Sequence, residues 1–246
     1  MSRRRFYVPK DCIHGSIALL SPDQSHHLRN VLRLKAGDAV EVFDGEGSAY
    51  AGVVDGFGNQ VRVASLQRLE SLADSGRSLI LVQALLKSDK FDWVLQKATE
   101  LGVRQIMPVE TRFGNVSLSD NKVSPRLERW NRIVLEASRQ CGRATVPQVH
   151  APLPFIDLVQ HLAPRNGTKL IFCEKASLPW DNSVQVQDDA VLCIGPEGGW
   201  DPSEVQTATR SGFRAFNLGL RILRAETAAI AALVLVQFQN SSHGVL

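Results

Sequence analysis

The strongest constraint on the fold of this sequence is a strand–helix–strand pattern that begins at residue 79. The apolar run LILVQALL is followed by Asp89 to Leu101, where apolar residues recur at three- and four-residue spacing, and then by a second strand-like segment, Gln105 to Val109. Short, almost continuous apolar runs are typical of strands buried on both faces, as in parallel sheets. The pattern therefore predicts a parallel α/β unit.

The same alternation continues through the rest of the chain. Helices are expected at Pro125 to about Gln140, near Phe155 to Leu162 and after Pro202, and strands at Lys169 to Cys173 and Ala190 to Ile194. Alternating strands and helices are typical of α/β domains with a mostly parallel sheet. We therefore expect an α/β domain over residues 73–246.

The last expected helix, Ala225 to about Gln239, contains the run AAIAALVLV and is apolar on nearly every face. A helix without a polar side does not lie on the surface of a monomer. We therefore expect it to be buried within the domain or against a partner chain.

The first 72 residues show a different pattern. Short alternating strands, AVEVF, SAYAGVVD and QVRVASLQRL, are separated by glycine turns, and Ser71 to Ser78 resembles a linker. Ahead of them, Ser21, Pro22 and Gln24 form a capping-box signature that predicts a helix start. We expect a small antiparallel barrel or sheet over residues 1–72.

The composition is that of an ordinary soluble globular protein, with 246 residues, 44% apolar and 22% charged. The longest apolar run, residues 228–236, is about half of the roughly 20 residues that a membrane-spanning helix needs. No apolar segment of the signal-peptide kind follows the first arginines. We therefore expect a cytoplasmic protein without a membrane partner.

The cysteines and histidines indicate no metal site. Cys12, Cys141, Cys173 and Cys193 are far apart in the sequence, and no two histidines have the spacing that places two ligands on one helix face. The cysteines are interpreted as buried thiols, and no metal is predicted.

The net charge of +3 is unevenly distributed along the chain. Residues 1–35 carry seven Lys and Arg against two acidic residues, residues 75–150 carry twelve against seven, and the last 96 residues carry seven against nine. Basic surfaces contribute most of the affinity for nucleic acid, because they neutralise phosphates. The distribution favours a polyanionic partner, although basic residues scattered over solvated faces would give the same counts.

The segment after the expected strand AVLCI combines glycines with a helix start. Gly195, Gly198 and Gly199 precede Trp200 and the capping-box signature that begins at Asp201. Glycines let backbone amides approach a ligand closely, and a helix N-terminus favours negative charge. The segment predicts a ligand loop, with a tight structural connection as the alternative.

A second loop, Asn217 to Arg224, leads into the last helix through Ala225 and Glu226. Arg224 and Glu226 at the N-terminus of this helix suit ligand recognition. The alternative is that they only interact with the helix dipole and with each other. A P-loop and the Gly-x-Ser-x-Gly elbow of serine hydrolases are absent from the sequence.

Together these two loops resemble the C-terminal signature of the RsmE family, SPOUT-class methyltransferases that use S-adenosylmethionine to methylate N3 of a uridine in 16S rRNA. The resemblance extends over nearly the whole chain. The segments that carry it are RRRFYVP, HHLRNVLRLKAGDAVEVFDGEG, KSDKFDWVLQKATELGV, EASRQCGRATVPQV, GPEGGW and NLGLRILRAETAAIAAL.

The resemblance implies a fold that periodicity alone does not show. It implies an N-terminal PUA-like β-barrel that binds RNA, and a C-terminal SPOUT α/β domain that contains a deep trefoil knot, the cofactor site and a homodimer interface. The knot contradicts the general rule that protein chains do not thread loops.

The resemblance also implies which residues hold S-adenosylmethionine. Glycines in the two loops would allow close backbone approach, Leu218, Ile222 and Leu223 would pack against adenine, and the end of the preceding strand would form a third wall. The implied cofactor-binding residues are Phe172, Cys173, Glu174, Ile194, Gly195, Pro196, Glu197, Gly198, Leu218, Gly219, Ile222, Leu223 and Arg224.

Three residues are candidates for catalysis. Arg224 would stabilise charge on the uracil carbonyls, and Arg143 would act similarly or hold a phosphate, from the same or the other subunit. Glu197 would orient the base or accept its proton, with bracing of the loop as the alternative. Alignment of N3 with the methyl group should dominate the rate enhancement.

The expected RNA-binding residues lie near the N-terminus, where charges alternate with aromatic residues. They are Arg3, Arg4, Arg5, Arg29, Arg33 and Lys35, and their partner would be 16S rRNA or the small ribosomal subunit.

Two other functions remain open from the sequence. One is an rRNA-binding assembly factor that has lost its chemistry, and the other is a SPOUT relative that methylates a ribose hydroxyl or another base. The sequence does not give the target nucleotide, the assembly state of the substrate, the general base, or the subunit that supplies each arginine.

Overall fold

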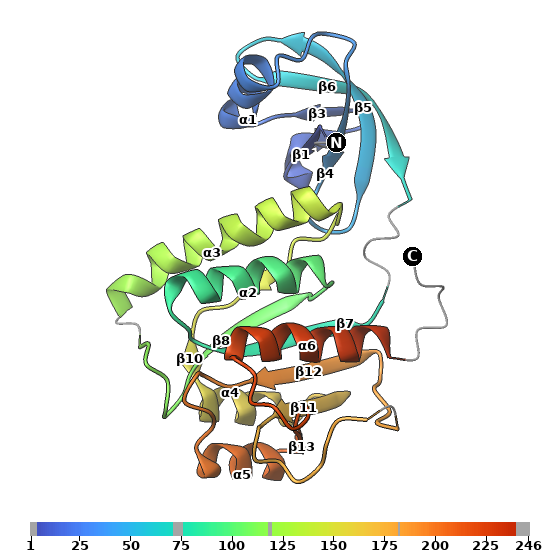
Figure 1. The fold of residues 1–246 in the computed structure, drawn as a ribbon. Helices are drawn as coiled ribbons and strands as arrows, with labels where there is room; N and C mark the ends of the chain where they lie inside the picture. The colour runs from blue at the N-terminus through green and yellow to red at the C-terminus, as the bar shows by residue number, and fades with distance from the viewer. Residues whose placement is uncertain (1–3, 71–75, 118–119, 182, 240–246) are drawn as a thin grey trace. The chain divides into compact units, whose positions relative to one another are not determined.

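The computed structural model describes residues 4–70, 76–117, 120–181 and 183–239. Its contacts divide the chain into two units (Figure 1). The first unit contains Met1–Ser75 together with Leu135–Val146, and the second contains Gly76–Val134 and Pro147–Leu246. The predicted boundary between residues 72 and 73 lies outside the described residues.

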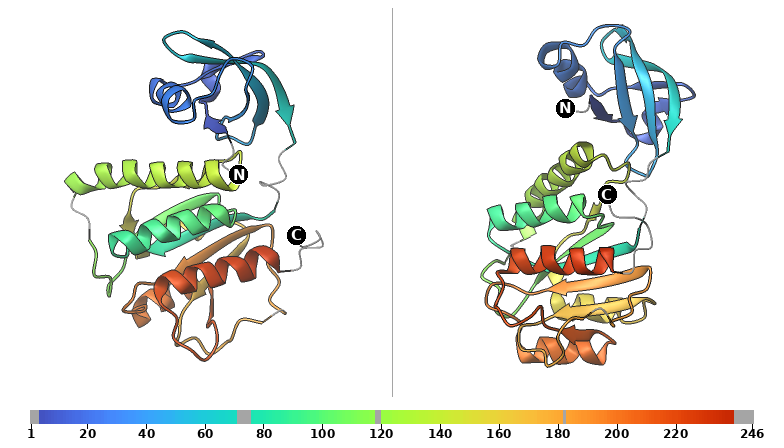
Figure 2. Two further views of the ribbon diagram at one scale, coloured as in Figure 1. Left: turned by 45° about the horizontal axis from the view of Figure 1, so that its top comes forward. Right: turned by 45° about the vertical axis from the view of Figure 1, so that its right-hand side comes forward.

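The first unit is built on a curled six-stranded sheet in the order β1-β4-β5-β6-β3-β2 (Figure 2). Its strands are β1 (Arg5–Tyr7), β2 (Ile13–His14), β3 (Ile17–Leu19), β4 (Ala39–Phe43), β5 (Ala49–Phe57) and β6 (Val61–Leu69). β1 pairs with β4 in parallel and the other pairs are antiparallel. Among the described residues β1 and β2 remain edge strands, so the structure shows a curled, open sheet, which is one of the two forms expected from the sequence.

The predicted start of the first helix is confirmed. Ser21 accepts a hydrogen bond from the Gln24 backbone, the Gln24 side chain accepts one from the Ser21 backbone, and Pro22 occupies the first helical position. The helix α1 (Pro22–His26) continues as a π-helical turn, His27–Val31, which buries Leu28 in the core of the sheet.

Arg5 was expected at an RNA-binding surface, but the structure places it in the core of the first unit, where it is 1% exposed. Its guanidinium group donates to the Glu41 carboxylate and to the carbonyls of Ser138 and Arg143, at 2.9 and 2.7 Å. It also lies over the Phe43 ring, 4.3 Å from the ring centre. Burial of a cation requires such partners, so we assign Arg5 a structural role and withdraw it as an RNA contact.

Residues 135–146 join the first unit because they complete its core, which the sequence did not indicate. Ala144 is buried with Phe43 and Ala49, and Tyr7, Leu135 and Val146 pack against them. Two backbone hydrogen bonds, Gly47 to Ala144 and Val146 to Gly45, fix this segment to the turn after β4.

The second unit is a parallel α/β domain, as predicted. Its sheet has the order β10-β8-β7-β12-β11-β13, with β9 also paired to β8, and all its pairs are parallel. The strands are β7 (Ser78–Ala84), β8 (Gln105–Glu110), β9 (Gln148–Val149), β10 (Leu153–Pro154), β11 (Thr168–Phe172), β12 (Asp189–Ile194) and β13 (Arg214–Phe216).

Helices cover both faces of this sheet (Figures 1 and 2). They are α2 (Ser88–Glu100), α4 (Phe155–Leu162), α5 (Pro202–Arg210) and α6 (Ala225–Phe238), whereas α3 (Asp120–Cys141) contacts α2 through Trp130 and Phe91 and ends in the first unit. One face packs against α4 and α5, through Ile80 and Val82 of β7 and Val191 and Cys193 of β12. The alternate residues of these strands face the opposite side, where α2 and α6 lie side by side. α4 has the predicted bounds.

Helix α6 is buried on one side only, through Ala225, Ala229, Ala232, Leu233 and Val236. Apolar side chains also project from its other side, where Val234 is 40% exposed, Leu235 39% and Phe238 59%. In the part of the chain that the structure describes, no helix combines the length and apolar character needed to cross a membrane.

We predict that Arg5→Met destabilises the protein by about 2–4 kcal/mol, because it leaves two buried carbonyls and the Glu41 carboxylate without their donor. The matched control is Arg4→Met. Arg4 is half-exposed and forms a 3.7 Å ion pair with Asp38. Removal of this ion pair should lower the free energy of unfolding by less than about 1 kcal/mol. Urea unfolding of both variants measures the difference, and equal destabilisation would contradict the structural role of Arg5.

Candidate active site

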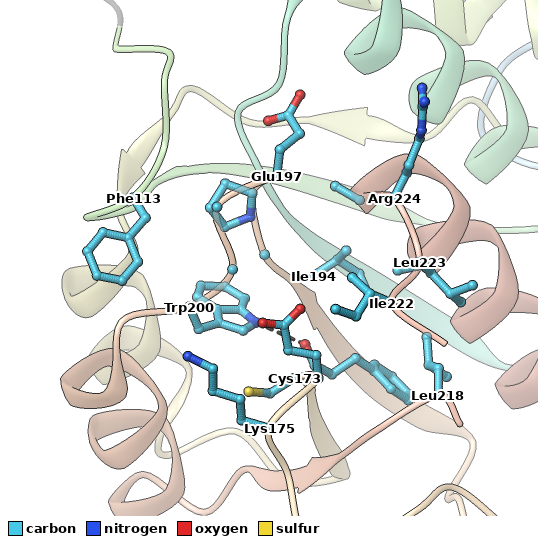
Figure 3. Close-up of a pocket in the computed structure, with 18 of the residues that line it drawn as sticks. Phe113, Cys173, Lys175, Ile194, Glu197, Trp200, Leu218, Ile222, Leu223 and Arg224 are labelled. Carbon is cyan, nitrogen blue, oxygen red and sulfur yellow. Dashed lines mark hydrogen bonds between the residues drawn. The ribbon is translucent and has the colours of Figure 1, made fainter. Parts of the chain in front are cut away.

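A pocket lies where the carboxyl ends of four parallel strands meet (Figure 3). Its volume is about 270 Å³. The lining residues follow β8, β11, β12 and β13 and are Phe113, residues 172–175, residues 194–200, Leu218, Gly219, residues 221–225 and Ala228. The carboxyl edge of an open parallel sheet is the usual position of a ligand site, because the connecting loops converge there.

The loop after β12 leaves little or no space for a Cβ atom at two of its glycines. A Cβ atom at Gly195 would lie 3.0–3.2 Å from the Trp200 indole, and one at Gly198 would lie 2.9 Å from the Phe113 carbonyl oxygen. Gly199 has φ of 75°, which favours glycine for conformational reasons. The loop therefore packs directly against its supports, and its backbone forms the pocket wall.

Trp200 supports this wall from behind. Its indole N–H donates to the Phe172 carbonyl at the end of β11, at 2.9 Å (Figure 3). Its ring packs on Phe155 of α4, with the ring centres 4.3 Å apart. Trp200 thus connects β11, the glycine loop and the core.

The predicted capping box after Trp200 is confirmed at the start of α5. The Asp201 side chain accepts from the Ser203 backbone, and Glu204 accepts from the Asp201 backbone. The hydroxyl and N–H of Ser203, together with the Arg112 guanidinium, hold the pKa of Asp201 below its usual value against partial desolvation. Glu204 also accepts the backbone N–H of Arg112 at 2.9 Å, so one carboxylate fixes both α5 and the loop after β8.

The loop after β13 is held by Asn217. Its side-chain amide donates to Ala176 at 2.8 Å, and its backbone bonds to Leu178 and Trp180. These bonds join it to the loop after β11. Gly219 then adopts φ of 103°, which only glycine adopts readily.

Charged residues border the pocket near the start of α6. Lys90 of α2 donates to Glu197 at 3.0 Å, and its ammonium group lies 3.9 Å from Glu226. In Figure 3 Glu197 and Arg224 point to the same side of the pocket, away from Cys173 and Lys175. This side therefore presents both signs of charge.

The structure brings all thirteen expected cofactor residues together around this one pocket. Ile222 and Leu223 lie across the pocket from Phe113 (Figure 3), and Ile222 is 81% exposed. Two of the three expected catalytic residues, Glu197 and Arg224, are also in the lining.

Arg143, the third catalytic candidate, does not line the pocket. It is 3% exposed and belongs to the first unit, where its carbonyl accepts a hydrogen bond from Arg5. A side chain that is buried in this way does not reach a substrate, and we withdraw the catalytic role for Arg143.

The remaining expected RNA-binding residues lie in the first unit, except for Arg3, which is outside the described residues. Arg4 and the backbone of Lys35 both contact the Asp38 carboxylate, which places them together. Arg29 is half-buried, donates to the Gly58 carbonyl and lies over the Phe57 ring, 5.6 Å from its centre. Arg33 and Lys35 are exposed.

Sequence reasoning missed several lining residues, among them Phe113, Lys175, Trp200 and Arg221. Trp200 directly follows the glycines, so its position was a usable signal. Phe113 gave none, because it reaches the site through the order of the strands in the sheet. Among the described residues, no cluster of three His, Cys, Asp or Glu side chains could hold a metal ion.

Comparisons with known proteins agree with this architecture. Residues 74–237 match the model of an RNA methyltransferase domain, and residues 20–56 match that of an RNA methyltransferase PUA domain.

Two similar proteins carry the same name, and a third is a methyltransferase with the same bound cofactor. The chain is 34% identical to ribosomal RNA small subunit methyltransferase E of Synechocystis sp., over 95% of this chain and 76% of that protein. The crystal structure of ribosomal RNA small subunit methyltransferase E from Neisseria gonorrhoeae bound to S-adenosyl methionine matches with a TM-score of 0.85 and 32% identity, over 94% and 95% of the chains. A methyltransferase from Legionella pneumophila in complex with the same cofactor matches with a TM-score of 0.84 and 31% identity, over 96% and 97%. The chain therefore belongs to the ribosomal RNA small subunit methyltransferase E family, whose RNA methyltransferase domain here contains the glycine-lined pocket.

Proposed function

We propose that this protein transfers a methyl group from S-adenosylmethionine to N3 of one uridine in the decoding region of 16S rRNA, in the cytoplasm. The observation that carries the proposal is the pocket formed by the glycine loops after β12 and β13 in an RNA methyltransferase domain. Two solved relatives with TM-scores of 0.84 and 0.85 hold the same cofactor.

The lining residues fit this cofactor chemically. Ile194, Leu218, Leu223 and Ala228 provide apolar surface for a nucleobase, and the glycine loop brings its main chain to the pocket wall. The Glu174 carboxylate lies near Gly199, within 3.6 Å of the place a Cβ would take, and is suited to accept from hydroxyl or ammonium groups. When bound, S-adenosylmethionine supplies an electrophilic methyl group.

We also propose that the second unit is knotted at this site. The chain leaves β13 at one edge of the sheet and returns as α6, which packs against α2 and β12 near the middle. A return of this kind supports passage of the C-terminal segment through an earlier loop.

Two side chains at the pocket rim, Glu197 and Arg224, are suited to deprotonate and orient the uracil. One oxygen of Glu197 accepts from Lys90, while its second oxygen accepts no hydrogen bond from the described residues. That oxygen is available to accept the N3–H proton. Arg224 provides donors for a uracil carbonyl as negative charge develops on it. Both side chains would align N3, and alignment contributes a large part of the rate enhancement.

The first unit is suited to bind the rRNA outside the pocket. Its PUA-type sequence, residues 20–56, includes Arg29, Arg33 and Lys35. The exposed side chains of Arg33 and Lys35, with half-exposed Arg4, offer charge to phosphates. The Arg29 guanidinium over Phe57 offers a stacking surface.

The decisive experiment is transfer of labelled methyl to small ribosomal subunits that lack the modification, followed by mapping through reverse transcription. Methylation at N3 blocks Watson–Crick pairing, so we expect a stop at one uridine. Cofactor binding without any transfer to the subunit would contradict the proposed substrate. Failure to bind cofactor as well would favour an assembly factor, and label without a stop would favour a ribose hydroxyl.

The same assay with the Arg224→Ala variant tests the catalytic role of Arg224. We expect transfer to fall by about a hundredfold or more with cofactor affinity within about threefold, since one preorganised donor to a developing charge contributes about 2.7–4 kcal/mol. Arg221→Ala, a neighbouring exposed arginine in the same lining, serves as the matched control. Unchanged turnover in Arg224→Ala would remove its catalytic role.

We further propose that two chains form a homodimer through α6. The exposed side chains of Val234, Leu235 and Phe238 form an apolar surface on this helix, and exposed apolar patches of this kind favour a protein partner. Sedimentation equilibrium should give the mass of two chains of 27.1 kDa each. Leu235→Glu should produce monomers, whereas Leu69→Glu, at similar exposure in the first unit, should not. A monomeric wild type would contradict this proposal.

A further inference from the structure

The loop after β8 presents an arginine and an aromatic residue at the rim of the pocket. Phe113 lines the pocket and is 44% exposed. The neighbouring Arg112 has a side chain that is 68% exposed. Neither residue belongs to the thirteen expected cofactor contacts, and the mechanism above does not use them.

The backbone of this loop is fixed, although its side chains are exposed. Glu204 accepts the Arg112 N–H at 2.9 Å, and a turn closes from the Gly114 N–H to the Thr111 carbonyl at 3.1 Å. Gly198 packs against Phe113, since a Cβ there would lie 2.9 Å from its carbonyl oxygen and 3.1 Å from its Cβ. The loop thus holds the Phe113 backbone and Cβ atom in one place relative to the glycine loop, with the ring extending from them.

The Phe113 ring has no aromatic partner among the described residues. Figure 3 shows it at one side of the pocket, with Ile222 and Leu223 at the other side and Glu197 between the two at the rim. A planar, partly exposed ring on a fixed backbone beside a pocket is a suitable platform for a nucleobase, because every base offers a flat face for stacking.

Arg112 lies beside this platform and keeps free donors. One terminal nitrogen of its guanidinium lies 3.5 Å from the Asp201 carboxylate, which orients the side chain. The guanidinium group has five N–H donors, so most of them remain available for a phosphate, which arginine binds in a bidentate manner.

We propose that Phe113 stacks on the target base and that Arg112 binds a phosphate next to that nucleotide. This inference rests on the proposed function, and it assigns the loop after β8 to RNA rather than to cofactor. A base that reacts at N3 must leave its pair and its stack. The Phe113 ring replaces part of the lost stacking while the Watson–Crick edge faces Glu197 and Arg224.

Steady-state methyl transfer to unmodified small subunits, at saturating S-adenosylmethionine, tests the stacking. We expect Phe113→Ala to lower kcat/KM for the subunit about tenfold or more, as is usual for loss of one base–aromatic stack. Phe113→Trp should retain activity within about twofold. Leu153→Ala is the matched control, since Leu153 is 46% exposed in the same unit and outside the pocket.

Calorimetric titration with S-adenosylmethionine shows whether Phe113 contacts the cofactor or the RNA. Cofactor affinity of Phe113→Ala should stay within about twofold of wild type. A parallel loss of cofactor affinity would make Phe113 a cofactor wall and overturn the inference, as would an unchanged kcat/KM. If the wild type itself transfers no methyl to the subunit, the proposed function fails and this inference fails with it.

The salt dependence of subunit binding tests Arg112. Removal of one phosphate contact reduces the slope of log K against log salt by about 1, so Arg112→Gln should show this decrease. An unchanged slope in a folded Arg112→Gln variant would overturn the phosphate contact.

Discussion

The site depends on the absence of a Cβ atom at two positions in the loop after β12. Gly195 lies against the Trp200 indole, where a methyl group would be tightly confined, and Gly198 lies against the Phe113 backbone, where a methyl group would force a shift. These two contacts fix the loop between the core and the loop after β8. The pocket wall is therefore backbone, which is suited to hold a cofactor at close range. The parallel order of the sheet is equally necessary, because it brings the ends of β8, β11, β12 and β13 to one edge.

Several residues serve two elements at once, which couples the fold to the site. Glu204 completes the cap of α5 and holds the loop that carries Arg112 and Phe113. Lys90 connects α2 to Glu197 of the glycine loop and approaches Glu226 at the start of α6. In the first unit, Arg5 joins β1 to the end of α3 in the same manner. Substitution of such a residue should therefore affect more than its own element.

The sequence predicts features that depend on near neighbours and misses those that depend on distant ones. Both capping boxes and α4 follow the predicted pattern, because the partners lie within a few residues. Burial of Arg5 was missed because its partners, Ser138 and Arg143, are 133 and 138 positions away. The role of Phe113 was missed because β8 and β12 are separated by β7 in the sheet, and nothing near residue 113 indicates the contact with Gly198. The thirteen cofactor positions were expected from resemblance to a family. In the structure all thirteen line the same pocket.

Calorimetry of S-adenosylmethionine binding to Gly198→Ala tests most directly whether the close-packed glycine loop holds the cofactor. The added methyl must displace the Phe113 backbone, so we expect affinity to fall by at least about tenfold, which corresponds to about 1.4 kcal/mol. Gly56→Ala is the matched control, because a Cβ at Gly56 meets nothing within 4 Å, and its affinity should equal that of wild type. Circular dichroism confirms that each variant is folded. Full cofactor affinity in folded Gly198→Ala would contradict the account.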